Sequence, residues 1–331
     1  MDAQEWSPDK LLALSGHYWK SFTLHAAIKL GVFTTIGTEQ FTGEELAQKL
    51  RGKKRSVITL LNALSAMNLI EKKSDKYSNT PAGISYLSKD SPEYIGYMIM
   101  HHHHLAESWS KLDKAVRAGG PVRSRSSYDD EEKRESFLMG MFNNAVNLAP
   151  RMVNTIDLLD RRRLLDLGGG PGTYAIYFCL KNPQLKATVY DLPTTRPYAI
   201  KTIEKFGLAD RIDFVEGDYL SKDISGSYDV AWLSQILHAE GPEDCQRIIE
   251  KVISVLEPGG MIIVHEFILD NTMDGPLFPA LFSLNMLLGT RNGRSYSEKE
   301  IMEMLARAGV GQIERLPFRL PNDSGIIRGV V

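Results

Sequence analysis

The stretch from Leu164 to Tyr174 reads "LLDLGGGPGTY": an apolar run interrupted by an acid, then three glycines, Pro171 and Gly172. Apolar residues followed by clustered glycines predict a strand that runs into a tight turn. Turns of this kind hold nucleotides because open backbone N–H groups at a helix N-terminus face the ligand. The spacing of the glycines indicates which nucleotide this turn suits.

The glycines follow the pattern G-x-G-x-G at Gly168, Gly170 and Gly172. The dinucleotide fingerprint G-x-G-x-x-G would need its third glycine at Thr173, and the phosphate-binding pattern G-x-x-x-x-G-K-[ST] does not occur. Asp166 lies two residues before the first glycine, and its carboxylate favours a ligand with positive charge. S-adenosylmethionine (SAM) has both a sulfonium and an ammonium group. NAD is the alternative, and Thr173 weakens it.

Short apolar runs alternate with helical stretches from about residue 157 onward. The predicted strands are "RLLDLGG" (163–169), "KATVYDL" (186–192), "IDFVEGD" (212–218), "YDVAWLS" (228–234), "GGMIIVHEFIL" (259–269) and "GQIERLPF" (311–318). Helices are predicted between them, including 242–256 and 298–309. This alternation predicts a doubly wound α/β fold with a mostly parallel sheet and right-handed crossovers. Ligands of such folds bind beyond the carboxyl ends of the strands.

Acidic residues also end the next two predicted strands. Asp191, followed by Leu192, closes the second strand, where a carboxylate can accept protons from both ribose hydroxyls. Gly217, Asp218 and Tyr219 follow the third strand, where they can hydrogen-bond and flank an adenine ring. NAD would also use Asp191, and each acid alone could be a helix N-cap or a surface carboxylate. Acids at three successive strand ends predict a nucleoside site.

The first part of the chain, to about residue 148, has mostly helical periodicity. The segment "LLALSGHYWKSFTLHAAIKLGVF" (11–33) is apolar on more than one face, which predicts burial by its own domain and by a partner subunit. Thr42 and Glu45 form a capping box for a short helix, and a second helix is expected over 56–67. A hairpin turning near Ser74 and Asp75 completes the pattern of a winged helix.

Winged helices bind DNA or serve as structural and dimerisation modules, and Arg51, Lys53, Lys54 and Arg55 form a basic loop that suits DNA. The net charge of the 331 residues is only −2, so no strong field recruits nucleic acid or an acidic membrane. The dimerisation module is therefore the favoured interpretation.

The chain begins without the pattern of a signal peptide and has no apolar run of about 20 residues. Its two cysteines, Cys179 and Cys245, form neither a disulfide framework nor a metal-ligand pair. We expect a cytoplasmic protein that binds neither membrane nor nucleic acid. The run His101–His104 invites a metal site, but on a helix only His101 and His104 would share a face, so no metal is predicted.

The ordered stretches "LLDLGGGPGTY", "VYDLP", "FVEGDYL", "LSQILHAEGPEDCQRIIEKV" and "LEPGGMIIVHEFIL" make the chain resemble the SAM-dependent O-methyltransferases of plant caffeate, hydroxyindole and bacterial polyketide-tailoring type. The resemblance covers nearly the whole chain. It implies a winged-helix-like dimerisation domain (1–100), a helical linker contributing to the acceptor pocket (101–155) and a Rossmann-like SAM-binding catalytic domain (156–331). It also implies a homodimer, with SAM converted to S-adenosyl-L-homocysteine.

The resemblance places the catalytic base on His238, which follows the strand "YDVAWLSQIL", and its supporting carboxylate on Glu266. A neutral imidazole can take the proton of a hydroxyl as the methyl group arrives. Ser234, beside Gln235, stands where plant members have a lysine that contacts the cofactor, so both residues are predicted to bind SAM. The sequence departs from the family pattern in two other ways. Ala239 and Glu240 replace an Asp and Trp after the histidine, and about Ser295 stands where plant enzymes have a second supporting Glu.

Two further helical segments are predicted to line the acceptor pocket, although ordinary helix core is the alternative for both. The residues are Met139, Phe142, Asn143 and Val146 in "FLMGMFNNAV", and Phe282, Asn285 and Met286 in "LFSLNMLLG". A largely apolar pocket suits a flat aromatic or polyketide-like molecule. The predicted function is methyl transfer to a hydroxyl of such a small molecule. The alternatives are S- or C-methylation on the same scaffold and a DNA-binding regulator that senses SAM or a metabolite.

Overall fold

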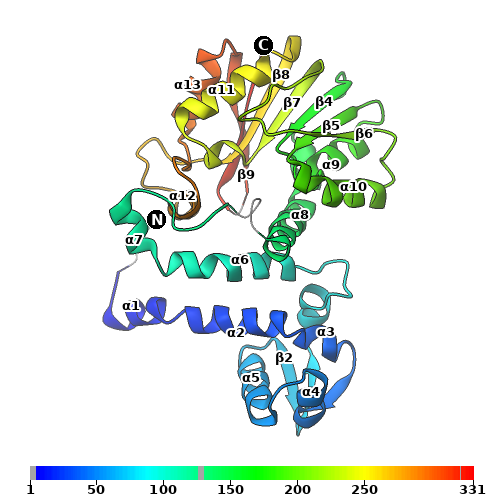
Figure 1. Ribbon diagram of the computed structural model, residues 1–331, viewed down its shortest axis with the longest axis vertical. Coiled ribbons are helices and arrows are strands. Elements are labelled where there is room, and N and C mark those ends of the chain that lie inside the picture. Colours follow the sequence, from blue (N-terminus) through cyan, green and yellow to red (C-terminus); the bar gives the residue numbers. More distant parts are fainter. Residues whose placement is uncertain (1–4, 126–129, 321) are drawn as a thin grey trace. The chain divides into compact units, whose positions relative to one another are not determined.

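The computed structural model describes residues 5–125, 130–320 and 322–331. The chain divides into two compact units, Met1–Leu105 and Ala106–Val331 (Figure 1). The three-part division expected from the sequence, with borders at 100 and 155, stays a prediction.

The first unit is mostly helical and carries one small antiparallel sheet of order β1-β3-β2. Its elements are α1 (Pro8–Ser15), α2 (Tyr18–Lys29), α3 (Val32–Ile36), β1 (Gln40–Thr42), α4 (Gly43–Lys49), α5 (Lys54–Ala66), β2 (Ile70–Lys73), β3 (Lys76–Asn79), a π-helical turn (Gly83–Leu87) and most of α6 (Gly96–Trp109), whose last turn belongs to the second unit. The capping box is confirmed, because Thr42 and Glu45 bond each other's backbone at the start of α4. The predicted hairpin is also present, as β2 and β3.

The apolar segment 11–33 forms three helices. Gly16 caps α1, and Gly31, with a left-handed φ of 70°, separates α2 from α3. Many apolar side chains of this segment lie on the surface of the single chain, and Leu12 and Trp19 are each 71% exposed. A soluble monomer rarely exposes so many large apolar groups along one segment.

The second unit is built on a seven-stranded sheet of order β6-β5-β4-β7-β8-β10-β9. Its elements are α7 (Leu112–Ala118), α8 (Glu131–Val153), β4 (Arg163–Leu167), α9 (Thr173–Lys181), β5 (Lys186–Asp191), a 3-10 turn (Pro193–Thr195), α10 (Arg196–Lys205), β6 (Ile212–Glu216), β7 (Tyr228–Ser234), a 3-10 turn (Leu237–Ala239), α11 (Pro242–Ile253), β8 (Leu256–Phe267), α12 (Leu277–Gly289), α13 (Glu298–Arg307), β9 (Gly311–Arg319) and β10 (Ser324–Val330).

Helices cover both faces of this sheet, with α9 and α10 on one side and α11 and α13 on the other (Figure 1). Alternate residues of each central strand therefore enter different cores. Along β7, Val230 and Trp232 face the core beneath α8, α9 and α10, whereas Ala231 and Leu233 face the core beneath α11 and α13. Because β4 to β8 are parallel, their carboxyl ends meet at one edge of the sheet.

Strand β10 is the strand of the seven-stranded sheet that the sequence pattern did not predict. It lies between β8 and β9 and is antiparallel to both. Its sequence, "SGIIRGV", contains two glycines, which weaken a strand pattern. Hydrogen bonds to a strand on each side, β8 and β9, compensate for the weak strand preference of these glycines.

Candidate active site

The glycine turn joins the end of β4 to the start of α9. Gly168, Gly170 and Gly172 all have left-handed φ angles, of 64°, 55° and 76°, which glycine adopts at least cost. A Cβ atom on Gly168 would lie 2.5 Å from the Ile236 side chain, so the turn packs closely against the segment that follows β7. Gly170 has open space where its side chain would be. The turn can thus approach a ligand with its backbone.

Asp166 lies directly beneath this turn and is 1% exposed. Its Oδ2 accepts the backbone N–H of Ala175 at 3.2 Å, whereas Oδ1 has no hydrogen-bond partner among the described residues. Burial, with a smaller contribution from the charge of Asp191, raises the pKa of Asp166 to about 7. A buried carboxylate oxygen without a donor is costly, so this site suits a ligand that brings a cationic donor.

Asp191 fastens the glycine turn to the end of β5. Its Oδ2 accepts the N–H of Gly170 at 2.8 Å, and its Oδ1 accepts the N–H of Leu192 at 2.6 Å and the hydroxyl of Thr195 at 3.1 Å. Burial raises the pKa of Asp191, and these three hydrogen bonds oppose the rise. The sequence pattern indicated Asp191 but missed Thr195, which becomes its partner through the 3-10 turn.

The segment after β6 places Tyr219 against the glycine turn, 3.6 Å from the position of a Cβ on Gly168. Asp218 accepts the N–H of Leu220 at 2.9 Å and the hydroxyl of Ser221 at 3.1 Å, so it also shapes its own loop. Gly217 is required here because any side chain would overlap the ring of Tyr190. These predicted adenine-site residues therefore lie at the same sheet edge as the turn.

Ser234 and Gln235 end β7 at the next position along this edge. The Ser234 hydroxyl lies 2.9 Å from Nδ1 of His265, whose Nε2 lies 3.0 Å from the Ser324 hydroxyl. Burial lowers the pKa of His265 to about 4, so this imidazole is neutral and can bridge the two serines. Gln235 has a left-handed φ of 56°, and its N–H donates to the His265 carbonyl. His265 and Ser324 were not predicted to belong to the site.

His238 lies in the 3-10 turn after β7, and Glu266 lies near the end of the adjacent strand β8. Nδ1 of His238 is 2.7 Å from Oε2 of Glu266, and Oε1 of Glu266 accepts the N–H groups of Leu237 at 2.9 Å and His238 at 3.3 Å. Both residues are buried. With Nδ1–H donating to the carboxylate, Nε2 of a neutral ring is an acceptor, and no described residue bonds it.

Two phenylalanines pack against the His238 ring, and a third packs against these two. Phe267 stacks on it at 5.9 Å between ring centroids, and Phe282 meets it edge-on at 4.8 Å. Phe278 contacts Phe267 at 4.9 Å. Only Phe282 was predicted from the sequence. Phe267 directly follows Glu266 in the sequence, and this position could have indicated that Phe267 belongs to the site.

The other predicted acceptor residues divide between two helices. On α12, Asn285 and Met286 are buried, and Oδ1 of Asn285 accepts a bond from Nη2 of Arg123 at 3.3 Å. On α8, Oδ1 of Asn143 is buried without a hydrogen-bond partner among the described residues, and Met139 and Val146 are half-buried.

Phe142, the fourth predicted acceptor residue on α8, is buried. Its ring packs against Phe206 at 6.5 Å and beneath the ammonium group of Lys205 at 6.0 Å. Phe142 thus contributes to the packing between α8 and the end of α10, and its place in the acceptor pocket stays a prediction.

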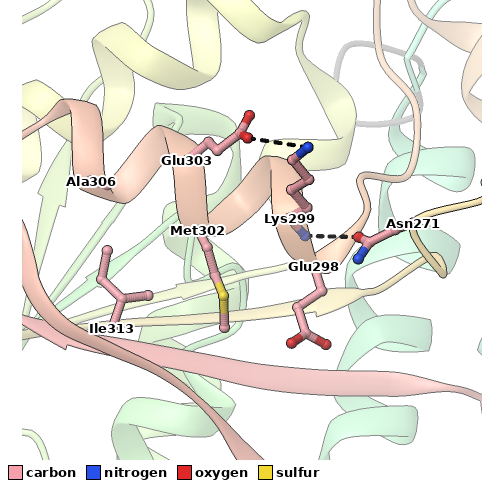
Figure 2. A pocket seen from close by; sticks show the side chains of 7 residues that line it. All are labelled: Asn271, Glu298, Lys299, Met302, Glu303, Ala306 and Ile313. Carbon is pink, nitrogen blue, oxygen red and sulfur yellow. Dashed lines mark hydrogen bonds and ion pairs between the residues drawn. The ribbon is translucent and has the colours of Figure 1, made fainter.

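Each unit has one further feature that the sequence analysis does not assign to the active site. In the second unit, a groove of about 370 Å³ lies beside α13 and is lined by none of the predicted site residues. Lys299, Met302 and Ile313 are among its lining residues (Figure 2). In the first unit, His103 packs against His25 at 5.5 Å and Phe22 at 6.1 Å.

Over the described residues no group of three or more His, Cys, Asp or Glu side chains could hold a metal ion. None of the helices in the described ranges is long and apolar enough to cross a membrane.

Comparison with known proteins identifies a methyltransferase family over most of the chain. The family model of the O-methyltransferase domain matches residues 103–311, and that of the O-methyltransferase dimerisation domain matches residues 12–89. The 3-hydroxy-5-methyl-1-naphthoate 3-O-methyltransferase of Streptomyces sahachiroi is 32% identical over 98% of this chain and 95% of its own. The tetracenomycin polyketide synthesis 8-O-methyl transferase TcmO of Streptomyces glaucescens is 28% identical over 97% and 96%.

Solved structures agree in fold. An O-methyltransferase family protein from Burkholderia thailandensis has a TM-score of 0.89 at 26% identity and covers 98% of both chains. The structure entitled PigF with SAH has a TM-score of 0.91 at 26% identity and covers 98% of this chain and 100% of its own. The chain belongs to the O-methyltransferase family and is a SAM-dependent O-methyltransferase with a dimerisation domain at its N-terminal side.

Proposed function

We propose that this enzyme methylates a hydroxyl group of a small aromatic or polyketide-like molecule, with His238 as the general base. The observation that carries the proposal is the 2.7 Å contact between Nδ1 of His238 and Glu266, which leaves Nε2 available inside a cluster of phenylalanines. A base, its orienting carboxylate and an aromatic surface are the groups that phenol methylation needs.

The reaction requires a proton acceptor beside the hydroxyl. SAM, when bound, supplies a methyl group activated by its sulfonium. Nε2 of His238 would take the hydroxyl proton as the new O–C bond forms. A phenol has a pKa of about 10 and a histidine of about 6.5, so removal of the proton in the transition state is more favourable than full ionisation beforehand. Glu266 would hold the ring in one tautomer and stabilise its protonated form.

The cofactor would lie along the carboxyl edge of the sheet. The unpartnered Oδ1 of Asp166 suits the ammonium group of SAM, and Asp191 suits the ribose hydroxyls. Asp218 and Tyr219 suit the adenine ring. The glycine turn, Ser234 and Gln235 would complete the site, and the hydroxyl of Ser234, held by neutral His265, replaces the cationic contact of the plant enzymes.

The names of two relatives support an aromatic acceptor. The Streptomyces sahachiroi enzyme is named for O-methylation of a hydroxynaphthoate, and TcmO for tetracenomycin polyketide synthesis. Phe267, Phe278 and Phe282 form a surface on which a flat ring can pack. Asn143, with its buried and unpartnered Oδ1, is the candidate for reading a polar substituent on that ring.

We also propose that the functional form is a homodimer through a winged-helix module in the first unit. The exposed apolar residues of α1, α2 and the turn that follows would meet the partner; they are Leu11, Leu12, Leu14, Tyr18, Trp19, Phe22 and Leu30. Their number fits an interface better than a solvated surface. The sheet β1-β3-β2 with α4 and α5 has the elements that a winged helix needs.

A matched pair of acceptors tests the oxygen specificity. We expect the purified enzyme with SAM to convert naphthols and hydroxynaphthoates to methyl ethers, measured by mass spectrometry, because their flat rings fit the phenylalanine surface. The corresponding naphthalenethiol is the control, since an aromatic thiol ionises more readily than the matching phenol and needs less help from a base. Methylation of the thiol together with no reaction at any hydroxyl would contradict the proposal.

The pH dependence of cofactor affinity tests the role of Asp166. We expect the affinity for SAM to rise as the pH increases through about 7 and then to level off. The pKa of this carboxyl is raised to about 7 in the free protein, and pairing with an ammonium group would lower it, so binding below that pH must release a proton. Each pH unit below the pKa then weakens affinity by up to about tenfold.

Calorimetric titration in two buffers with different ionisation enthalpies measures both the affinity and the protons released. Asp166→Asn keeps the shape of the side chain and is expected to weaken SAM binding and to abolish the pH dependence. A variant that retains the full pH dependence would show that another group carries it.

A further inference from the structure

A short segment before α8, Val122–Arg125, connects α12, which carries predicted acceptor residues, to the turn that carries His238. We call this segment the strap. The N–H groups of Val122 and Arg123 both donate to the Leu288 carbonyl, at 3.0 and 3.2 Å, near the end of α12. Nη2 of Arg123 donates to Asn285 one turn earlier on the same helix. The strap is therefore fixed to α12 by backbone and side-chain bonds.

The strap holds the His238 turn through Arg125. Its Nη1 donates to Oε1 of Glu240 at 2.6 Å, and its Nη2 donates to Oε2 at 2.8 Å and to the Ala239 carbonyl at 2.8 Å. The Glu240 side chain is only 4% exposed. A buried carboxylate without a partner is strongly unfavourable, whereas a two-point guanidinium contact restricts both distance and orientation. Arg125 thus fixes the main chain directly after His238.

The other contacts of this turn come from different directions. Glu266 accepts the N–H groups of Leu237 and His238, and the Tyr296 hydroxyl donates to the Glu240 carbonyl at 2.6 Å. A Cβ on Gly293 would lie 2.5 Å from the His238 carbonyl, so that backbone also packs against the turn. Among these contacts, Arg125 is the one that links the turn to α12 through the strap.

We propose that Arg125 is a positioning residue for methyl transfer. It keeps the His238 turn at a fixed distance and orientation relative to the predicted acceptor residues on α12. This inference rests on the proposed role of His238. Glu240 stands at a position where this sequence departs from the family pattern, so the Arg125–Glu240 pair belongs to this chain's own way of fixing the base. A displacement of the base by about 1 Å is enough to lower the rate about a hundredfold.

Steady-state kinetics of Arg125 variants test the proposal. We expect Arg125→Met to lower kcat by about 10–100-fold and to leave the dissociation constant of SAM unchanged, because the variant moves the base and not the cofactor site. Arg125→Lys, which keeps the charge but loses the two-point contact, should recover part of kcat. Guanidinium ion added to Arg125→Gly should also recover part of kcat, and it should not do so for His238→Ala.

Arg315→Met is the matched control. Arg315 pairs with Glu298 at 2.6 Å and is 29% exposed, close to the 28% of Arg125, but its pair lies between β9 and α13. We expect this variant to keep the kcat of the unmodified enzyme. Glu240→Gln keeps the size of the side chain but removes its charge, and it should reproduce the loss in kcat. The double variant with Arg125→Met should lose little more than either single variant.

The outcomes separate this inference from the proposed function. An unchanged kcat in both Arg125→Met and Glu240→Gln overturns the positioning role. A loss of kcat that neither lysine nor guanidinium restores, with weaker SAM binding, also overturns it and indicates a purely structural pair. An unchanged turnover in His238→Ala instead overturns the assignment of the base, whatever the Arg125 variants show.

Discussion

Replacing His238 with alanine is expected to lower the turnover number for O-methylation by about 10²–10⁴-fold. The substitution removes the acceptor nitrogen Nε2, for which no described side chain is a substitute. The dissociation constant of SAM should stay close to that of the unmodified enzyme. The predicted cofactor contacts come from the ends of β4, β5, β6 and β7 and do not include the His238 ring, which packs against Phe267 and Phe282.

Turnover with a naphthol acceptor and calorimetric titration with SAM measure the two quantities separately. Imidazole added to His238→Gly provides the control, because a free base that restores part of the turnover shows that the fold and the cofactor site are intact. An alanine variant with normal turnover on a phenol contradicts the assigned role. A strong effect on a phenol with a weak effect on a thiol supports it, since the thiol ionises more readily.

Replacing Glu266 with glutamine is expected to lower turnover by a similar factor, about 10²–10⁴-fold, although the side chain keeps its shape. The carboxylate of Glu266 accepts from Nδ1 of His238 and from the backbone N–H groups of Leu237, His238 and Phe267. The amide oxygen of glutamine can accept from the N–H groups of Leu237 and His238, but its NH₂ group then faces Nδ1. That contact favours the tautomer with the proton on Nε2, which cannot take a proton from the acceptor.

Glu257→Gln is the matched control for this variant, because Glu257 lies near the opposite end of the same strand and is exposed beside Arg163. We expect its turnover to be unchanged. Nitrogen NMR of labelled histidine reports the tautomer directly, and Glu266→Gln should move the proton of His238 from Nδ1 to Nε2. Unchanged turnover together with an unchanged tautomer in Glu266→Gln would show that Glu266 does not orient the base.

Local patterns in the sequence predicted most of the fold. The glycine turn between Leu167 and Thr173, the capping box of Thr42 and the strand "YDVAWLS" all depend on residues within a few positions of one another. Such features follow from backbone geometry and from the alternation of side chains along a strand. Strand β10 was missed because its glycines hide the local pattern and its pairing with β8 and β9 supplies the stability instead.

In the candidate site, too, some features follow from the local sequence and others depend on tertiary packing. The sequence alone determined which strand ends carry Asp166, Asp191, Asp218 and His238, because the order of strands and turns fixes the residues that reach the carboxyl edge of a parallel sheet.

Only the tertiary structure decided which distant side chains become partners. It turned Phe142 toward Phe206, joined His265 to Ser324 and paired Arg125 with Glu240. Arginines and glutamates occur on any protein surface, so nothing near position 125 or 240 marks them as a pair. The packing of α12 and the strap against the turn after β7 buries Glu240, and burial makes a specific cationic partner necessary.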